Sequence, residues 1–112
     1  MGRPSTPRRP ERPTGVSEAD LERIVGRVMA TLPQDMPMPT PTVIAGVGSI
    51  PPRQRRVLVG RFRYAGVVVA PQAEWVYVYL DPLVMDFGSD VSAIEEAVRR
   101  TLVEDVGPGF KA

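Results

Sequence analysis

The chain has 112 residues, of which 43% are hydrophobic, and its formal net charge is +1. These values are typical of one small globular domain. The absence of cysteine excludes a disulfide framework, and no apolar run approaches the roughly 20 residues that span a bilayer. Because the N-terminus also lacks the apolar core of a secretory signal, we expect a cytoplasmic protein with no membrane contact.

Residues 1–16 form a basic tail that is rich in Pro, Ser, Thr and Arg and has almost nothing to bury. This composition predicts disorder, because little burial is available to offset the chain entropy. The cationic residues of the tail are Arg3, Arg8, Arg9 and Arg12. They favour a solubilising tail, with a nucleic-acid contact through phosphates as the alternative. The folded domain is expected at residues 17–112.

The first helix is expected to begin at Ser17 and to end before Pro33. Ser17 and Asp20 have the spacing of an N-terminal cap, and proline cannot continue a helix. One apolar stripe runs along the helix and is formed by Leu21, Ile24, Val25, Val28 and Leu32. This stripe predicts a helix that packs on a sheet.

The central part of the chain predicts a small sheet. Short β-branched or alternating runs suggest strands at residues 42–47, 56–62, 67–70 and 74–80. Asp81 and Pro82 are turn-formers and are expected to end the last strand. The fold class is therefore α+β, with a mixed sheet of three to four strands packed by two helices.

Aromatic residues share one face of the last predicted strand. Trp75, Tyr77 and Tyr79 alternate with the apolar residues Val76 and Val78. The aromatic row is a candidate surface for stacking on bases or on a peptide. The alternative, which we favour, is that the rings are buried and the two hydroxyl groups reach the rim of the sheet.

Five arginines gather around the second predicted strand, namely Arg53, Arg55, Arg56, Arg61 and Arg63. Residues 1–63 carry eleven cationic and five acidic side chains, whereas residues 64–112 carry three and eight. The cluster suggests an anionic partner such as nucleic acid or an acidic peptide. The favoured alternative is that these arginines pair with carboxylates of the last helix, which are Glu95, Glu96, Glu104 and Asp105.

The last helix is expected at residues 92–106. Ser92 and Glu95 have the spacing of a capping box, and the apolar face is formed by Ile94, Ala97, Val98, Thr101, Leu102 and Val106. Proline at 108 is expected to end the helix, and the neighbouring glycines suit a left-handed cap.

Three stretches of the chain resemble a known family. They are the helix end at 31–33, the strand and turn at 76–83, and the run at 95–110. Together they resemble the minimal zincin-like metallopeptidases, small bacterial domains whose final helix carries HExxH. The resemblance covers residues 17–110 and implies a zincin-like fold. It places Glu104 at the first zinc-binding histidine, Asp105 at the general-base glutamate, Pro108 at the second histidine and Gly109 at the histidine after it.

These motif positions are vestigial, because the chain contains no histidine and no cysteine. Zinc peptidase sites use imidazole ligands at this spacing, so we expect no catalytic residue, no metal ligand and no cofactor. The main hypothesis is a degenerate pseudoenzyme that binds an extended peptide or a protein. The alternatives are an active metallopeptidase with unusual ligands and a basic nucleic-acid-binding module.

Overall fold

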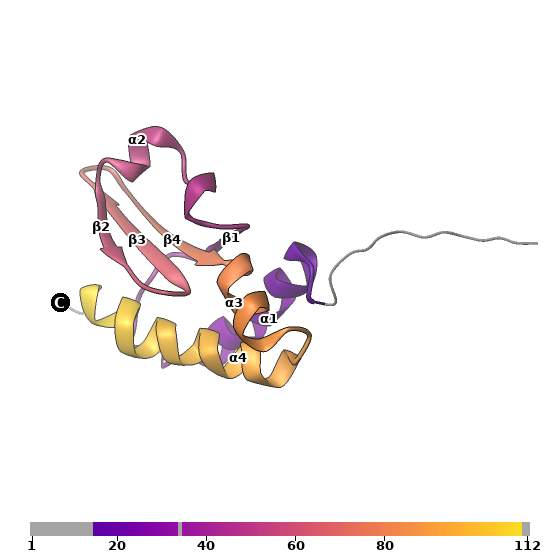
Figure 1. Cartoon of the computed structure of the whole chain (residues 1–112). Coiled ribbons are helices and arrows are strands. Elements are labelled where there is room, and N and C mark those ends of the chain that lie inside the picture. Colours follow the sequence, from indigo (N-terminus) through magenta and orange to yellow (C-terminus); the bar gives the residue numbers. More distant parts are fainter. Residues whose placement is uncertain (1–14, 34, 111–112) are drawn as a thin grey trace, which may run out of the picture.

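A computed structural model describes residues 15–33 and 35–110, and it confirms the α+β class. A four-stranded mixed sheet has the order β1-β4-β3-β2, in which β1 is parallel to β4 and the other neighbours are antiparallel (Figure 1). The strands are β1 (Thr42–Ile44), β2 (Leu58–Arg61), β3 (Ala65–Ala70) and β4 (Ala73–Tyr79). The helices are α1 (Glu18–Thr31), α2 (Pro52–Arg55), α3 (Leu80–Phe87) and α4 (Val91–Arg100).

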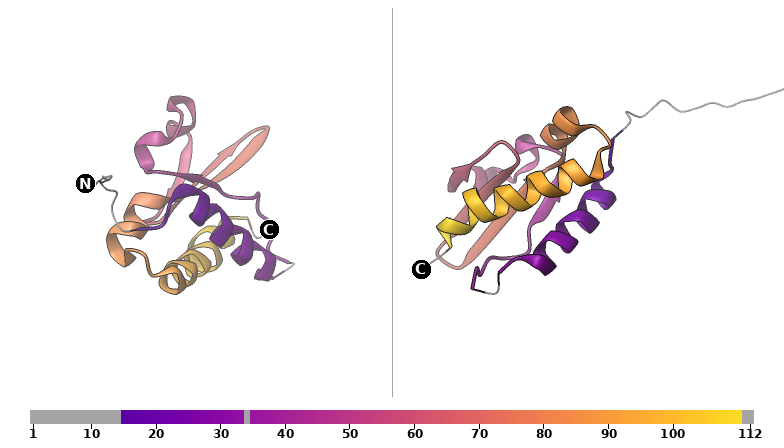
Figure 2. Two further views of the ribbon diagram at one scale, coloured as in Figure 1. Left: turned by 90° about the vertical axis from the view of Figure 1, so that its right-hand side faces the viewer. Right: turned by 90° about the horizontal axis from the view of Figure 1, so that it is seen from below.

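Helices α1 and α4 lie side by side under one face of the sheet, as the two-helix prediction required (Figures 1 and 2). The main core fills the space between this face and the helices. Its buried side chains include Leu21, Ile24, Val25 and Val28 of α1, Val67, Val76 and Val78 of the sheet, and Ile94 and Val98 of α4. The apolar stripes of both helices are therefore buried as expected.

The N-terminal cap of α1 is confirmed. The Ser17 hydroxyl accepts a hydrogen bond from the Asp20 N–H, and the Asp20 carboxylate accepts one from the Ser17 N–H, both at 3.1 Å. Val16, which was expected in the tail, is buried in the main core. The disorder predicted for the tail otherwise concerns residues 1–14, which lie outside the described residues.

A second apolar cluster covers the opposite face of the sheet. It consists of Ile50, Val68, Tyr77 and Tyr79, which are buried, with Trp75 packed against them. The segment that contains α2 folds over this cluster (Figure 1). The expected burial of the aromatic rings is thus confirmed for Tyr77 and Tyr79, whereas Trp75 is half-buried.

The predicted turn at Asp81 and Pro82 is wrong, because helix α3 begins at Leu80. The first turn of a helix has N–H groups without intrahelical partners, so proline is tolerated there. Asp81 also places a negative charge at the positive end of the helix. Gly88 closes α3 with φ of 63°, a left-handed conformation that glycine adopts without strain. Helix α2, with Pro52 as its first residue, was likewise not predicted.

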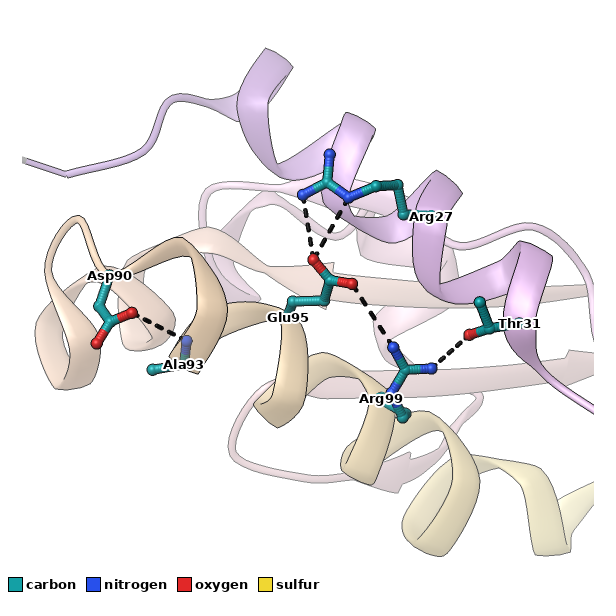
Figure 3. A network of polar contacts seen from close by, with 6 residues as sticks. All are labelled: Arg27, Thr31, Asp90, Ala93, Glu95 and Arg99. Carbon is teal, nitrogen blue, oxygen red and sulfur yellow. Dashed lines mark hydrogen bonds and ion pairs between the residues drawn. The ribbon is translucent and has the colours of Figure 1, made fainter.

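Helix α4 begins earlier than expected. Its cap is Asp90, whose carboxylate accepts a hydrogen bond from the Ala93 N–H at 3.1 Å. The predicted capping box of Ser92 and Glu95 does not form, because Glu95 points instead toward α1 and receives Arg27 at 3.1 Å and Arg99 at 3.6 Å (Figure 3). Arg99 also donates to the Thr31 hydroxyl. This network joins the two helices.

The end of α4 is wider than an α-helix. The chain continues as a π-helical turn (Thr101–Val106) and then as a 3₁₀ turn (Gly107–Gly109). Pro108 lacks the N–H that would bond the Glu104 carbonyl in an α-helix, and the Gly107 N–H reaches back to the Leu102 carbonyl. Gly107 has φ of −54°, so the predicted left-handed cap is not formed there. None of the described helices is long and apolar enough to cross a membrane.

Candidate functional site

A groove of about 450 Å³ lies between the β2–β3 turn and helix α4. Its floor is formed by the small side chains of Ala93, Ala97 and Thr101, which follow one another at four-residue spacing along the helix. One wall carries the rings of Tyr64 and Phe87, whose centroids are 5.9 Å apart. The groove therefore combines a shallow floor with an aromatic wall.

A fixed polar cluster stands at the rim of this groove. The Arg63 guanidinium binds both carboxylate oxygens of Asp86, with two N–O distances of 2.6 Å. The Tyr64 hydroxyl donates to the same carboxylate, and the Arg63 guanidinium lies 5.7 Å from the Tyr64 ring centroid. Because the interaction is bidentate, it holds the arginine plane in one orientation.

The electrostatics of this cluster oppose a role in proton transfer at neutral pH. The hydrogen bonds from Arg63 and Tyr64 lower the pKa of Asp86 from 3.8 to about 2. Burial, followed by the hydrogen bond to Asp86, raises the pKa of Tyr64. The carboxylate therefore stays ionised and the phenol stays protonated, whereas a general acid or base works best with a pKa near the operating pH.

The far end of the groove is acidic. Glu104 and Asp105 are exposed there, at the C-terminal end of the long helix, where the helix dipole is already negative. Neither carboxylate makes an ion pair within 15–33 and 35–110, whereas Glu96 in the middle of the groove pairs with Arg100 at 3.6 Å. This end of the groove thus attracts a cation.

The residues at the positions that the family resemblance aligns with a zinc motif do not fit a zinc ion. Glu104 and Asp105 are adjacent in sequence, and Pro108 at the next motif position has no side-chain donor atom. Within the described part of the chain, no three carboxylate or imidazole side chains gather into a group that would hold a metal. Protein zinc sites typically have three or four ligands.

The predicted aromatic residues lie away from this groove, on the opposite face of the sheet. Tyr77 is buried and its hydroxyl donates to the Gln54 side chain. The hydroxyl of Tyr79 is also buried and has no hydrogen-bond partner among residues 15–33 and 35–110. The expectation that both hydroxyl groups reach the rim is therefore wrong for Tyr79. Trp75 is half-buried beside them.

The predicted arginines separate into two groups. Arg63 lines the groove, and Arg55 is tied to the Ile50 carbonyl by its Nε at 2.8 Å. The others, Arg53, Arg56 and Arg61, are exposed and pair with no carboxylate of the described residues. The expected ion pairs between this cluster and the carboxylates of the last helix are wrong for the described residues. Helix α2, which carries Arg53 and Arg55, lies across the sheet from α4 (Figure 1), and Arg63 pairs with Asp86 instead.

Two residues that line the groove, Tyr64 and Phe87, were not predicted as site residues, and neither was the pairing of Asp86 with Arg63 at the rim. Their contacts join the β2–β3 turn to α3, and Arg63 and Asp86 are 23 positions apart. A local sequence pattern cannot indicate a contact between residues so far apart in the chain. The one available signal was the position of Arg63 at the end of the basic run.

The outer edge of β2 adjoins the same turn. The Phe62 N–H donates to the Ala65 carbonyl at 2.8 Å, so the backbone of Phe62 faces β3. Because backbone direction alternates along a strand, the N–H and C=O of Arg61 face away from the sheet. A bulge between Leu58 and Gly60 interrupts the pairing, so an added strand would pair at the Arg61 end.

No family model, curated protein or solved structure matches this chain.

Proposed function

We propose that this chain is a degenerate zincin-like protein that binds an extended peptide, or an extended segment of a protein, without zinc and without cleaving it. The groove between the β2–β3 turn and α4 carries this proposal. It has an aromatic wall beside the turn that follows β2, the last strand of the sheet order, and it ends at Glu104 and Asp105, the positions that the resemblance aligns with the zinc motif. Peptides are commonly held by main-chain pairing with a sheet edge, which needs no metal.

The groove supports binding better than chemistry. Arg63 and Asp86 bind each other through two hydrogen bonds. The floor of the groove is made of small side chains and contains no nucleophile activated by a base. A small floor suits an occupant whose backbone lies close to the helix. The rings of Tyr64 and Phe87 then offer a large contact area at a low entropy cost.

The binding proposal is tested by recording backbone amide spectra of the full chain during titration with blocked octapeptides. Three peptides of equal apolar content and net charge +2, 0 and −2 are compared. We expect concentration-dependent shifts at Arg61, Ala93, Ala97 and Thr101, largest for the cationic peptide. Shifts spread evenly over the molecule, or none with any peptide, would contradict the proposal.

The non-catalytic part is tested separately by elemental analysis of untagged protein after zinc loading and dialysis, together with a peptidase assay with and without chelator. We expect no stoichiometric zinc and no chelator-sensitive cleavage. About one zinc per chain together with such cleavage would support the alternative of a metallopeptidase with unusual ligands.

One observation favours a second candidate function, which is binding of nucleic acid. Arg53, Arg56 and Arg61 are exposed and unpaired within the described residues, and helix α2, which carries Arg53, lies across the sheet from α4 (Figure 1). Phosphate contacts require only such clustered cations, and their affinity falls steeply with salt. Binding of single-stranded or duplex DNA that weakens with salt and with an R53Q/R56Q/R61Q variant would support it.

A further inference from the structure

The N-terminal segment has a regular pattern that matches the groove. Prolines occur at every third position, as Pro4, Pro7, Pro10 and Pro13. The polyproline II helix has three residues per turn, so prolines at this spacing share one of its faces. Arg3, Arg9 and Arg12 have the same spacing and share a neighbouring face. Sequences of this kind are recognised by grooves lined with aromatic side chains.

The groove offers partners for both faces. The rings of Tyr64 and Phe87 form an aromatic wall of the kind on which prolines pack. The carboxylates of Glu104 and Asp105, which make no ion pair among the described residues, lie at the acidic end. A guanidinium binds a carboxylate through two parallel hydrogen bonds. The chemistry of the groove thus suits a cationic, proline-spaced segment.

The charges of the two parts are complementary over the whole chain. Residues 1–14 carry four arginines and one glutamate, a net charge of +3. Residues 15–110 carry nine cationic and twelve acidic side chains, a net charge of −3. Association of the two parts is therefore favoured at low salt and screened at high salt.

The segment also starts close enough to reach the groove. Gly15 lies against Val84 of α3, one helical turn before Phe87 of the aromatic wall. Fourteen extended residues span up to about 45 Å at roughly 3.3 Å each. The helical stretch from Val91 to Val106 is about 24 Å long at 1.5 Å per residue. The reach exceeds the length of the groove floor.

We infer that residues 1–14 dock in the groove of the same chain, with prolines against Tyr64 and Phe87 and arginines beside Glu104 and Asp105. This inference rests on the proposed function, because it names the class of peptide that the groove takes. An external partner then competes with the chain's own segment, so that the segment sets how readily the groove is occupied.

The test uses the full chain with one spin label. Because the sequence has no cysteine, a Ser5→Cys substitution gives a single attachment point. We expect the label to weaken the amide signals of Ala97, Thr101 and Glu104, and to do so much less in about 1 M NaCl, where the Debye length is about 3 Å. An R8Q/R9Q/R12Q variant should lose the effect, whereas the charge-matched R8K/R9K/R12K control should retain most of it.

Three results would overturn the inference. The first is unchanged intensity of the groove amides, and the second is an effect that R8Q/R9Q/R12Q leaves intact. The third is an effect seen only between a labelled chain and a second, isotope-enriched chain, which would assign the groove to another copy. The proposed function is tested independently by adding the octapeptides to the R8Q/R9Q/R12Q variant. If the octapeptides shift the groove amides but the spin label has no effect, only the docking of residues 1–14 is contradicted. If neither the octapeptides nor the spin label affects the groove, the proposed function is contradicted as well.

Discussion

Substitution of Gly66 by alanine gives a sharp test of the packing described above. Gly66 lies on β3, and the hydroxyl end of the Tyr79 side chain lies directly against it. A Cβ at position 66 would overlap the Tyr79 hydroxyl and would lie 3.1 Å from Tyr79 Cζ and 3.3 Å from Leu58 Cδ1. Tyr79 is fully buried and cannot move without disturbing the second apolar cluster.

Overpacking of this kind typically lowers the free energy of unfolding by about 1–3 kcal/mol, and we expect G66A to lie in the upper half of that range. Gly26 is the matched control, because a Cβ there meets nothing within 4 Å and the residue is exposed inside α1. Glycine in a helix is less favourable than alanine by roughly 0.5–1 kcal/mol. The same substitution should therefore stabilise the protein at position 26.

The Tyr79→Phe variant removes the group that the new Cβ would meet. Because the Tyr79 hydroxyl has no hydrogen-bond partner in the part of the chain that the structure describes, its removal should cost nothing or raise the free energy of unfolding by up to about 1 kcal/mol. In the Y79F background G66A should be less costly by about 1 kcal/mol or more, which is a coupling typical of residues in contact.

The four variants are compared by urea unfolding, followed through the fluorescence of Trp75. It is the single tryptophan of the chain and packs against the same cluster. A shift of the midpoint at constant slope reports a change in stability. The account is refuted if G66A is as stable as the parent protein, or if its cost is the same with and without the Tyr79 hydroxyl.

Other substitutions test the groove rim and helix α4. The carboxyl pKa of Asp86, lowered to about 2 by Arg63, should return toward 4 in R63Q when followed by carbon NMR, and an unchanged value would exclude the ion pair. Since this pKa is lowered on folding, the stability that Asp86 contributes is present above about pH 4 and is lost as pH falls toward 2. Ile94→Ala should lower the free energy of unfolding by about 2–5 kcal/mol, because Ile94 is fully buried. A loss of less than about 1 kcal/mol in urea unfolding would contradict its place in the core. Asp90→Ala should lower the free energy of unfolding by about 1 kcal/mol through loss of the cap, whereas S92A should change it little. A larger loss for S92A than for D90A would instead support a helix that begins at Ser92.

The layers of the fold were predictable, because apolar periodicity reports the buried face of α1 and of α4, and because valines alternate with aromatic residues along β4, which is buried on both faces. The boundaries of the helices were harder to predict. Asp90 and Ser92, for example, are two positions apart and are both residue types that favour a helix N-terminus. The choice between them depends on Glu95, which is held by Arg27 of α1. Helix α3 was missed because an aspartate followed by proline suits both a turn and the first turn of a helix.

The site was much less predictable than the fold. The sequence singled out Arg63, Glu104 and Asp105, and the structure brings these three to one groove. It could not indicate Tyr64 and Phe87, because the pairing of a hairpin turn with a distant helix leaves no periodic signal. The aromatic row of β4, in contrast, was recognisable in the sequence because its residues alternate regularly along the strand. It packs in the second apolar cluster and does not line the groove.

The central claim is that the groove between the β2–β3 turn and α4 binds an extended peptide. The most direct test measures the affinity of a fluorescent octapeptide of net charge +2 for three full-length chains: the parent, Ala93→Phe and Ser92→Phe. Ala93 lines the groove floor, whereas Ser92 is exposed on the same helix outside it. We predict that A93F weakens binding at least about tenfold, or roughly 1.4 kcal/mol, and that S92F binds like the parent. Equal affinity of all three chains would contradict the claim.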